Sequence, residues 1–327
     1  MNLFSRFRGA LRASIIGLMS ASLAAPAFAD YPDKPLKIIV PWATGGSTDA
    51  LARTLAQRLA QTLGQSVIVE NRPGAAAAIG TSEMAKAAPD GYTLGIIELP
   101  HALAPSVVAK LPYDLQKDLQ PVAMIGTSPM ILFSSSQLPA KNVAELIAAA
   151  KAAPGQISIA HSGNGTSSHV VAELLQQKAG VKFNLAGYKG SGPALLDVAG
   201  GHVQAHFATL ASGFGPMKTG KVNAMAVAAE QRLESLKDSP TFAEAGVKDF
   251  VLEQWWGVVA PKGTPPAIIE KLRVEINAAI SHQNMQDRMR DLAVQPRPMT
   301  PAQFAAFVDS EVKRWAVVVK TAGIKPE

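Results

Sequence analysis

The sequence predicts an α/β fold with two lobes, each built on a mainly parallel sheet flanked by helices. Short β-branched strands alternate with helical segments from residue 36 to residue 97, and the same alternation starts again near residue 129. An apolar strand at 255–260 then leads to two closing helices. Strands that are joined through helices run parallel with right-handed crossovers, so each series predicts one α/β layer.

The first series follows the order strand, helix, strand, helix, strand. Its first strand, LKIIVP, is apolar and β-branched, which is typical of a buried strand. The leucines of the following helix recur every four residues on one face, and Gly64 ends that helix. We expect strands at 36–41, 67–70 and 93–97, helices at 51–63 and 76–88, and a turn at 71–74.

The second series repeats this alternation with its own elements and indicates a second lobe. The strand at 255–260 (WWGVVA) then leads away from it, and the two closing helices begin at Thr264 and Thr300 with prolines in their first turns. We expect strands of the second series at 129–134, 157–160, 203–209 and 224–228, and helices at 143–152, 167–178 and 193–199.

Residues 1–29 have the features of a cleavable export signal. Arg6, Arg8 and Arg12 form a basic start, an apolar run covers 13–23, and Ala-Phe-Ala at 27–29 is a small-x-small cleavage site. The apolar run is short for a membrane span, so a retained N-terminal anchor is the weaker alternative. We therefore predict a signal peptide at 1–29 and a periplasmic mature protein.

The composition excludes several classes of function. The 327 residues are 48% hydrophobic and 17% charged, which is typical of a globular protein, and they include no cysteine, so thiol catalysis and thiolate metal sites are excluded. Cleavage of the signal removes three arginines from a formal net charge of +6, so we expect no nucleic-acid surface. No second apolar stretch is long enough to span a membrane, and we expect a soluble product.

The sequence offers little support for an enzyme. It contains no G-x-S-x-G elbow and no nucleotide-binding glycine motif after a strand. His202 and His206 have a zinc-like spacing, but on the expected strand they would lie about 13 Å apart. His169 and Glu173 share a helix face without an evident third ligand. We therefore expect no enzyme activity, no cofactor and no metal.

Several ordered sequence blocks run through the mature chain. They are YPDKPLKIIVP at 31–41, GG-x-x-D-x-x-AR at 45–53, LGQ-x-V-x-VENRPG at 63–74, PDGYTL at 89–94, LPYD at 111–114, YKG at 188–190, WWG at 255–257 and P-x-GTP at 261–265. At this spacing they resemble the solute-binding proteins of tripartite tricarboxylate transporters, the Bug family. The chain departs from the family pattern at 43–44, at Gly187 and at 98–101 (ELPH).

The resemblance implies a two-lobed periplasmic binding protein, type II-like, with its ligand cleft between the lobes. It implies a receptor that closes on a small organic anion, often a carboxylate, and delivers it to membrane transporter subunits. With the element order, it predicts one lobe from 30–129 with 254–327 and a second from 130–253. We expect a monomer; an exported hydrolase or a metal-dependent enzyme is the alternative.

Ligands of such sheets lie beyond the carboxyl ends of the strands. The segment after the first strand is one candidate, because glycines let backbone N–H groups approach a ligand, although a tight turn with an N-cap explains it equally well. An acid in the first helical turn already uses the positive helix end, so an anion would meet the loop amides or a water. The candidates here are Trp42, Thr44, Gly45, Gly46, Ser47, Thr48 and Asp49.

The segment after the strand at 157–160 is a cleaner anion site. Three hydroxyls open a helix that has no acid before Glu173, so its positive end is uncommitted. Ordinary N-capping explains only one of these hydroxyls, and we expect all three to donate to a carboxylate. The candidates are Gly163, Asn164, Gly165, Thr166, Ser167, Ser168 and His169.

Other candidates follow the remaining strands. One tryptophan of the WWG block is expected to face inward, with core packing as the alternative. Glu98 and His101 either face the cleft, where Glu98 would favour a ligand that also carries an amine or a hydroxyl, or lie in a loop facing water. The further candidates are Tyr188, Gly190, Ser191, Thr209, Ser212 and Trp255.

Overall fold

The computed structural model describes residues 31–321, and the predicted signal at 1–29 lies outside them. Tyr31, Pro32 and Asp33 lie outside the compact unit that begins at Lys34, and the description below concerns that unit. Within the described residues, no helix has both the length and the apolar character that crossing a membrane would need.

The first of two sheets has six strands in the order β11-β4-β10-β3-β1-β2. β1 pairs in parallel with β2 and β3, whereas β10 runs antiparallel between β3 and β4, and β11 antiparallel to β4. The strands are β1 (Leu36–Val40), β2 (Val67–Asn71), β3 (Thr93–Glu98), β4 (Leu119–Pro129), β10 (Glu253–Pro261) and β11 (Gln295–Pro296).

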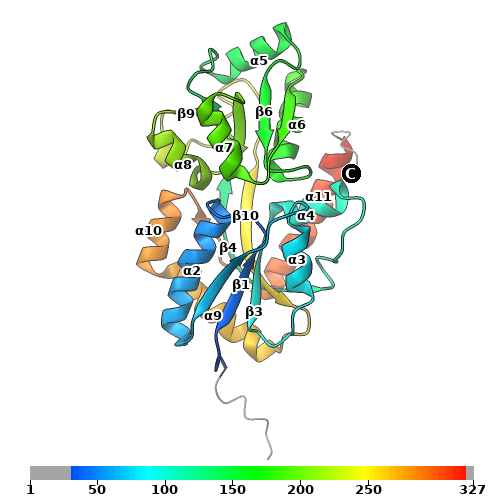
Figure 1. The fold of residues 1–327 in the computed structure, drawn as a ribbon, viewed down its shortest axis with the longest axis vertical. Coiled ribbons are helices and arrows are strands. Elements are labelled where there is room, and N and C mark those ends of the chain that lie inside the picture. The colour runs from blue at the N-terminus through cyan, green and yellow to red at the C-terminus, as the bar shows by residue number, and fades with distance from the viewer. Residues whose placement is uncertain (1–30, 322–327) are drawn as a thin grey trace, which may run out of the picture. The chain divides into compact units, whose positions relative to one another are not determined.

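Helices cover both faces of this sheet. Figure 1 shows α2, α9 and α10 on one face and α3, α4 and α11 on the other. The leucines at 51, 55 and 59 are fully buried, as their four-residue spacing predicts, and Gly64 ends α2 in the left-handed conformation. The helices are α2 (Ser47–Leu63), α3 (Ala78–Ala85), α4 (Leu99–Val107), α9 (Pro266–Ser281), α10 (Gln283–Asp291) and α11 (Pro301–Thr321).

The second sheet has five strands in the order β7-β6-β8-β5-β9. β6 pairs in parallel with β7 and β8, and β5 runs antiparallel between β8 and β9. Its strands are β5 (Ile131–Ser135), β6 (Ser158–His161), β7 (Asn184–Gly187), β8 (Ala205–Ala208) and β9 (Val222–Val227). Its helical elements are α5 (Val143–Ala152), α6 (Ser167–Ala179), α7 (Ser191–Gly200), α8 (Leu210–Lys218) and the 3₁₀ helix η1 (Glu234–Leu236).

The two-lobed α/β class is confirmed, but both sheets are mixed rather than mainly parallel. The chain leaves the first sheet at the end of β4, enters the second at β5 and returns at β10. Strands that begin or end such a crossing are not joined to their neighbours through a helix, so they are free to pair antiparallel. The lobe boundaries at 129/130 and 253/254 stay a prediction.

The sequence pattern missed several elements. The elements without a predicted counterpart are β4, β7, β11, α4, α8, α10 and η1, and the strand expected at 203–209 is only four residues long. His202 therefore lies in the turn before β8, and the expectation that it shares a strand with His206 is wrong.

Candidate functional site

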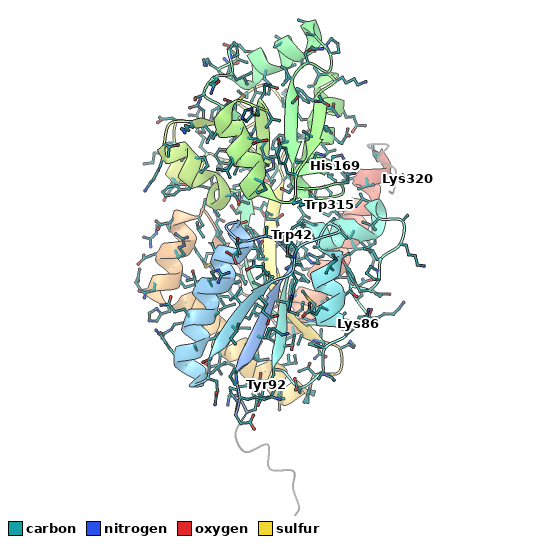
Figure 2. The ribbon with its side chains drawn as sticks, viewed as in Figure 1. Trp42, Lys86, Tyr92, His169, Trp315 and Lys320 are labelled. Carbon is teal, nitrogen blue, oxygen red and sulfur yellow. The ribbon has the colours of Figure 1, made fainter. Side chains whose placement is uncertain are left out.

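A cavity of about 610 Å³, part of it open to solvent, is lined by loops that follow strands of both sheets. Trp42 is one of the lining residues, and Figure 2 shows it where elements of the first sheet meet those of the second. Among the described residues that line the cavity, Glu98 has the only charged side chain.

Helix N-termini converge on this cavity. Residues in the first turns of α2, α6, α7 and α8 line it, and the N-cap residues of these four helices make no side-chain capping bond. By contrast Asn142 caps α5, which does not line the cavity. The first-turn N–H groups of a helix are donors at a positively polarised end. α6, α7 and α8 carry no acid in their first turns. We call these three helix N-termini uncommitted, because no acidic side chain of their own first turn balances their positive polarity.

A buried histidine fixes the direction of one chain of hydrogen bonds beside the cavity. His206 Nδ1 lies 2.8 Å from the carbonyl oxygen of Ala160, which can only accept, so Nδ1 carries the proton. Burial lowers the pKa of His206 to about 4, so the ring is neutral and its Nε2 accepts from the Ser191 hydroxyl at 3.1 Å. Ser191 Oγ then accepts from Ser162 Oγ at 2.9 Å.

The hydroxyls at the start of α6 also have protein acceptors. Thr166 donates to the carbonyl oxygen of Gly163 at 2.7 Å, and Ser168 donates to Ser162 Oγ at 3.2 Å while accepting the Ser162 N–H at 2.9 Å. In this structure the hydroxyls of Thr166 and Ser168 therefore donate within the protein, and that all three hydroxyls donate to a ligand stays a prediction. Among the described residues, Ser167 takes no part in this network.

Three buried polar atoms of the lining have no hydrogen-bond partner within residues 31–321. They are Trp42 Nε1, Thr209 Oγ1 and Gln254 Oε1. Buried polar groups are nearly always paired, so unpaired ones at a cavity indicate contact with a ligand or water. The first is a donor, the second donates or accepts, and the third only accepts.

Glu98 is the centre of the hydrogen bonds on the first-sheet side. It is 4% exposed, and its Oε2 accepts from Thr48 Oγ1 at 2.6 Å and from Gln254 Nε2 at 2.7 Å. Trp256 Nε1 donates to Thr48 Oγ1 at 3.0 Å, which directs the Thr48 proton to the carboxylate. Burial raises the pKa of Glu98 to about 7, although these donors oppose the rise.

Glu98 also caps α4, which the sequence analysis treated as a loop. Its side chain accepts the backbone N–H of His101, and the His101 ring accepts the backbone N–H of Glu98 at 3.0 Å. Burial lowers the pKa of His101 to about 4, and its Nε2 lies 3.0 Å from Thr81 Oγ1. Of the two alternatives, water-facing loop groups are excluded: Glu98 lines the cavity and His101 is buried behind it.

The structure brings most of the predicted site residues to one cavity. Those in its lining are Trp42, Thr44, Gly46, Ser47, Thr48, Glu98, Thr166, Ser167, Ser168, Gly190, Ser191, Thr209 and Ser212. Those outside the lining are Gly45, Asp49, His101, Gly163, Asn164, Gly165, His169, Tyr188 and Trp255.

Asp49 organises the loop after β1 instead of facing the cavity. It accepts the Gly45 N–H at 3.1 Å, and it also accepts from Arg53 and Asn71. Burial alone would raise its pKa, but these donors hold the pKa below its usual value. Gly45 has a φ of +88°, so this turn favours glycine for a backbone reason.

Trp255 and Tyr188 are engaged elsewhere. Trp255 is buried and donates to Glu311 Oε2 at 3.1 Å, which fits the core-packing alternative. Tyr188 donates to Asp197 at 2.7 Å.

Asn164 and His169 line a second hollow beside the cavity, together with His161. The rings of His161 and His169 stack at 4.5 Å, and His169 lies 3.7 Å from Glu173. Among the described residues, no group of three or more histidine, aspartate or glutamate side chains could hold a metal ion.

Gly165 lies where two parts of the chain come close. Its φ is +72°, and a Cβ atom there would lie 2.4 Å from Val107 Cγ2 of α4. Gly163 also has a positive φ, of +127°. These glycines shape the loop before α6 rather than lining the cavity.

Sequence reasoning missed several lining residues, among them Ser162, Phe207 and Gln254. Ser162 directly follows β6, so the strand-end rule could have found it one residue earlier. Gln254 precedes the two tryptophans on a strand with no polar motif, and only the antiparallel pairing of β10 brings it to Glu98.

The fold and the cavity define a two-lobed α/β solute-binding protein. The family model described as the tripartite tricarboxylate transporter family receptor matches residues 51–324. The chain belongs to this family and is a solute-binding receptor.

The relatives are similar to this chain over nearly its whole length. The chain is 39% identical over 317 residues to the protein BugT of Bordetella pertussis. This alignment covers 95% of this chain and 97% of BugT. It is similar to the structure of the periplasmic binding protein BugD, with 34% identity, a TM-score of 0.87 and coverage of 91% and 100%. MatC from Rhodopseudomonas palustris with bound malate is 33% identical, with a TM-score of 0.84 and coverage of 88% and 100%.

Proposed function

We propose that this receptor binds a small organic carboxylate in the cavity at the ends of the two sheets. The single observation that carries the proposal is the convergence of three uncommitted helix N-termini, α6, α7 and α8, on a cavity without lysine, arginine or histidine in its lining. Backbone amides at helix N-termini bind anions without a cationic side chain. The malate bound to MatC supports the same class of ligand.

The carboxylate would take its hydrogen bonds from backbone amides in the first turns of the three helices and from the hydroxyl of Thr209. That hydroxyl has no partner among the described residues, and Thr209 is 4% exposed, whereas the Ser212 amide of α8 already donates to the Thr209 carbonyl oxygen. Each hydrogen bond to a charged group contributes roughly 1.5 to 3 kcal/mol. A few such bonds are enough for a receptor of micromolar or better affinity.

In this proposal the mature protein acts in the periplasm after removal of residues 1–29, as a monomer that changes no bond in its ligand. Two lobes close on the carboxylate by a hinge movement, and the closed complex is delivered to membrane transporter subunits. The family's name as a transporter receptor supports this role.

A thermal-shift screen of small organic acids against the mature chain tests the proposal. A ligand that binds only the folded state at 100 times its Kd adds about 2.7 kcal/mol to the free energy of unfolding. We expect at least one carboxylate to raise the melting temperature and to be recovered unchanged by mass spectrometry. A panel in which no acid shifts the melting temperature, or in which the acid is consumed, would contradict a passive receptor.

A further inference from the structure

We propose that Glu98 and Gln254 form a second subsite in the cavity, one that binds an ammonium group of the ligand. The ligand is then an amino acid or a similar carboxylate that carries a primary amine. This inference rests on the proposed function, because it assigns the other end of the same ligand.

The first argument is charge. Glu98 has the only charged side chain among the described lining residues, and it is negative. Above its pKa of about 7 Glu98 is ionised, and a ligand whose only charges are carboxylates then brings like charge into the cavity, which disfavours binding. A ligand with an ammonium group beside Glu98 would balance that charge.

The second argument is the balance of hydrogen-bond donors and acceptors. Gln254 is 5% exposed, and its Nε2 is directed at Glu98, so its Oε1 is an acceptor without a partner among the described residues. An acceptor of this kind cannot pair with a carboxylate, so its partner is a water or a donor group of the ligand. Glu98 and Gln254 therefore present acceptors on one side of a cavity whose other side presents donors.

The third argument is rigidity. Glu98 is held by the Thr48 hydroxyl, by Gln254 and by the His101 backbone, from three different elements. The Trp256 indole holds Thr48 in turn. The acceptor subsite is preorganised, so its selectivity does not require a rearrangement when the ligand binds.

Matched acids that differ in one substituent test the proposal. The mature chain is titrated by calorimetry at pH 8 with succinate, malate and aspartate, and with glutarate, 2-hydroxyglutarate and glutamate. Within each chain length the second carbon carries hydrogen, hydroxyl or ammonium. We expect the aminated acid to bind at least about tenfold more tightly than the unsubstituted one, with the hydroxylated acid between them.

Two variants and one control locate the effect. In Glu98→Gln we expect the preference for the aminated acid to fall to within about twofold. Gln254→Met, which removes the second acceptor together with the Nε2 donor to Glu98, should also reduce it. Glu311→Gln is the control, because Glu311 is another buried carboxylate that accepts from two indoles but does not line the cavity. Circular dichroism melting checks that each variant is folded.

The outcomes separate this inference from the proposed function. Equal binding of the three acids of one length, or tighter binding of the hydroxylated than of the aminated acid, would overturn the ammonium subsite and leave the carboxylate receptor intact. An unchanged preference in both folded variants would also overturn it. If no acid of either series binds the wild-type chain, the proposed function and the subsite are both overturned for these ligands.

Discussion

The two sides of the cavity solve the same problem of burying polar groups in opposite ways. On the side of the first sheet, the Glu98 carboxylate accepts from Thr48 and Gln254 and also caps α4, while Trp42 Nε1 has no partner among the described residues. On the side of the second sheet, the hydroxyl protons of Ser191 and Thr166 are directed to His206 and to a backbone carbonyl oxygen, and the N-cap side chains of α6, α7 and α8 make no capping bond. A cavity whose described lining holds no cationic side chain can therefore still be polarised, with most acceptors on one side and most donors on the other.

The largest expected effect comes from adding an acid to the donor side. Thr209→Asp would place a carboxylate at the N-cap of α8, where it uses the amides that we assign to the ligand. Two like charges about 4 Å apart repel by about 4 kcal/mol at an effective dielectric constant of 20, so carboxylate affinity should fall roughly a thousandfold. Calorimetry with the acid of the panel that binds the wild type most tightly measures this loss of affinity.

Thr209→Asn is the matched control, because asparagine also caps a helix and has nearly the same shape without the charge. If the Asp and Asn variants bind the acid equally well, α8 does not face the ligand's carboxylate, and the donor side of the comparison is wrong.

The next effect belongs to the acceptor side and needs no ligand. Burial raises the pKa of Glu98 from 4.5 to about 7, so between these pH values the folded state holds a proton that the unfolded chain has already lost. The free energy of unfolding should therefore fall as pH rises from about 4.5 to 7, by about 3 kcal/mol for this group.

Glu98→Gln isolates this contribution, because the variant cannot ionise at that position. Urea titrations at each pH give the free energy of unfolding of the wild type and of the variant. As pH rises, we expect the wild type to lose stability relative to the variant. A difference that stays constant from pH 4.5 to 7 would show that Glu98 is not desolvated, and the two sides of the cavity would then differ less than their geometry indicates.

The sequence could predict more of the donor side of the cavity than of the acceptor side. The donor side follows in part from local rules. β6 and β8 end within one residue of their predicted ends, and Ser191 and Thr209 were predicted as site residues. The strand β7 before Ser191 and the helix α8 after Thr209 had no predicted counterpart. Even there the hydroxyls of Thr166 and Ser168 were expected to face the ligand, because the direction of their protons depends on partners such as Ser162 and Gly163 that only the fold brings into reach.

The acceptor side depends on contacts that are distant in the chain. Glu98 and Gln254 are separated by 156 positions and meet because β10 returns antiparallel beside β3. From the sequence we expected mainly parallel sheets and no helix at 99–107. The sequence therefore could not decide whether Glu98 and His101 face the cleft or lie in a loop facing water. The predicted pocket wall, Trp255, is instead part of the core.

The smallest expected effect concerns the hydrogen bond between the Ser191 hydroxyl and the neutral ring of His206. Ser191→Ala removes the hydroxyl between His206 and Ser162 and leaves His206 Nε2 and the Ser162 hydroxyl without this partner. A buried polar atom left unpaired costs about 1 to 3 kcal/mol, so urea unfolding should show a loss of about 1 to 2 kcal/mol. Ser212→Ala is the control, because Ser212 lines the same cavity outside this chain of hydrogen bonds, and it should cost less than about 0.5 kcal/mol. Equal losses in the two variants would mean that the Ser191 hydroxyl is not held by His206, and the protons on this side would then be free to face the ligand after all.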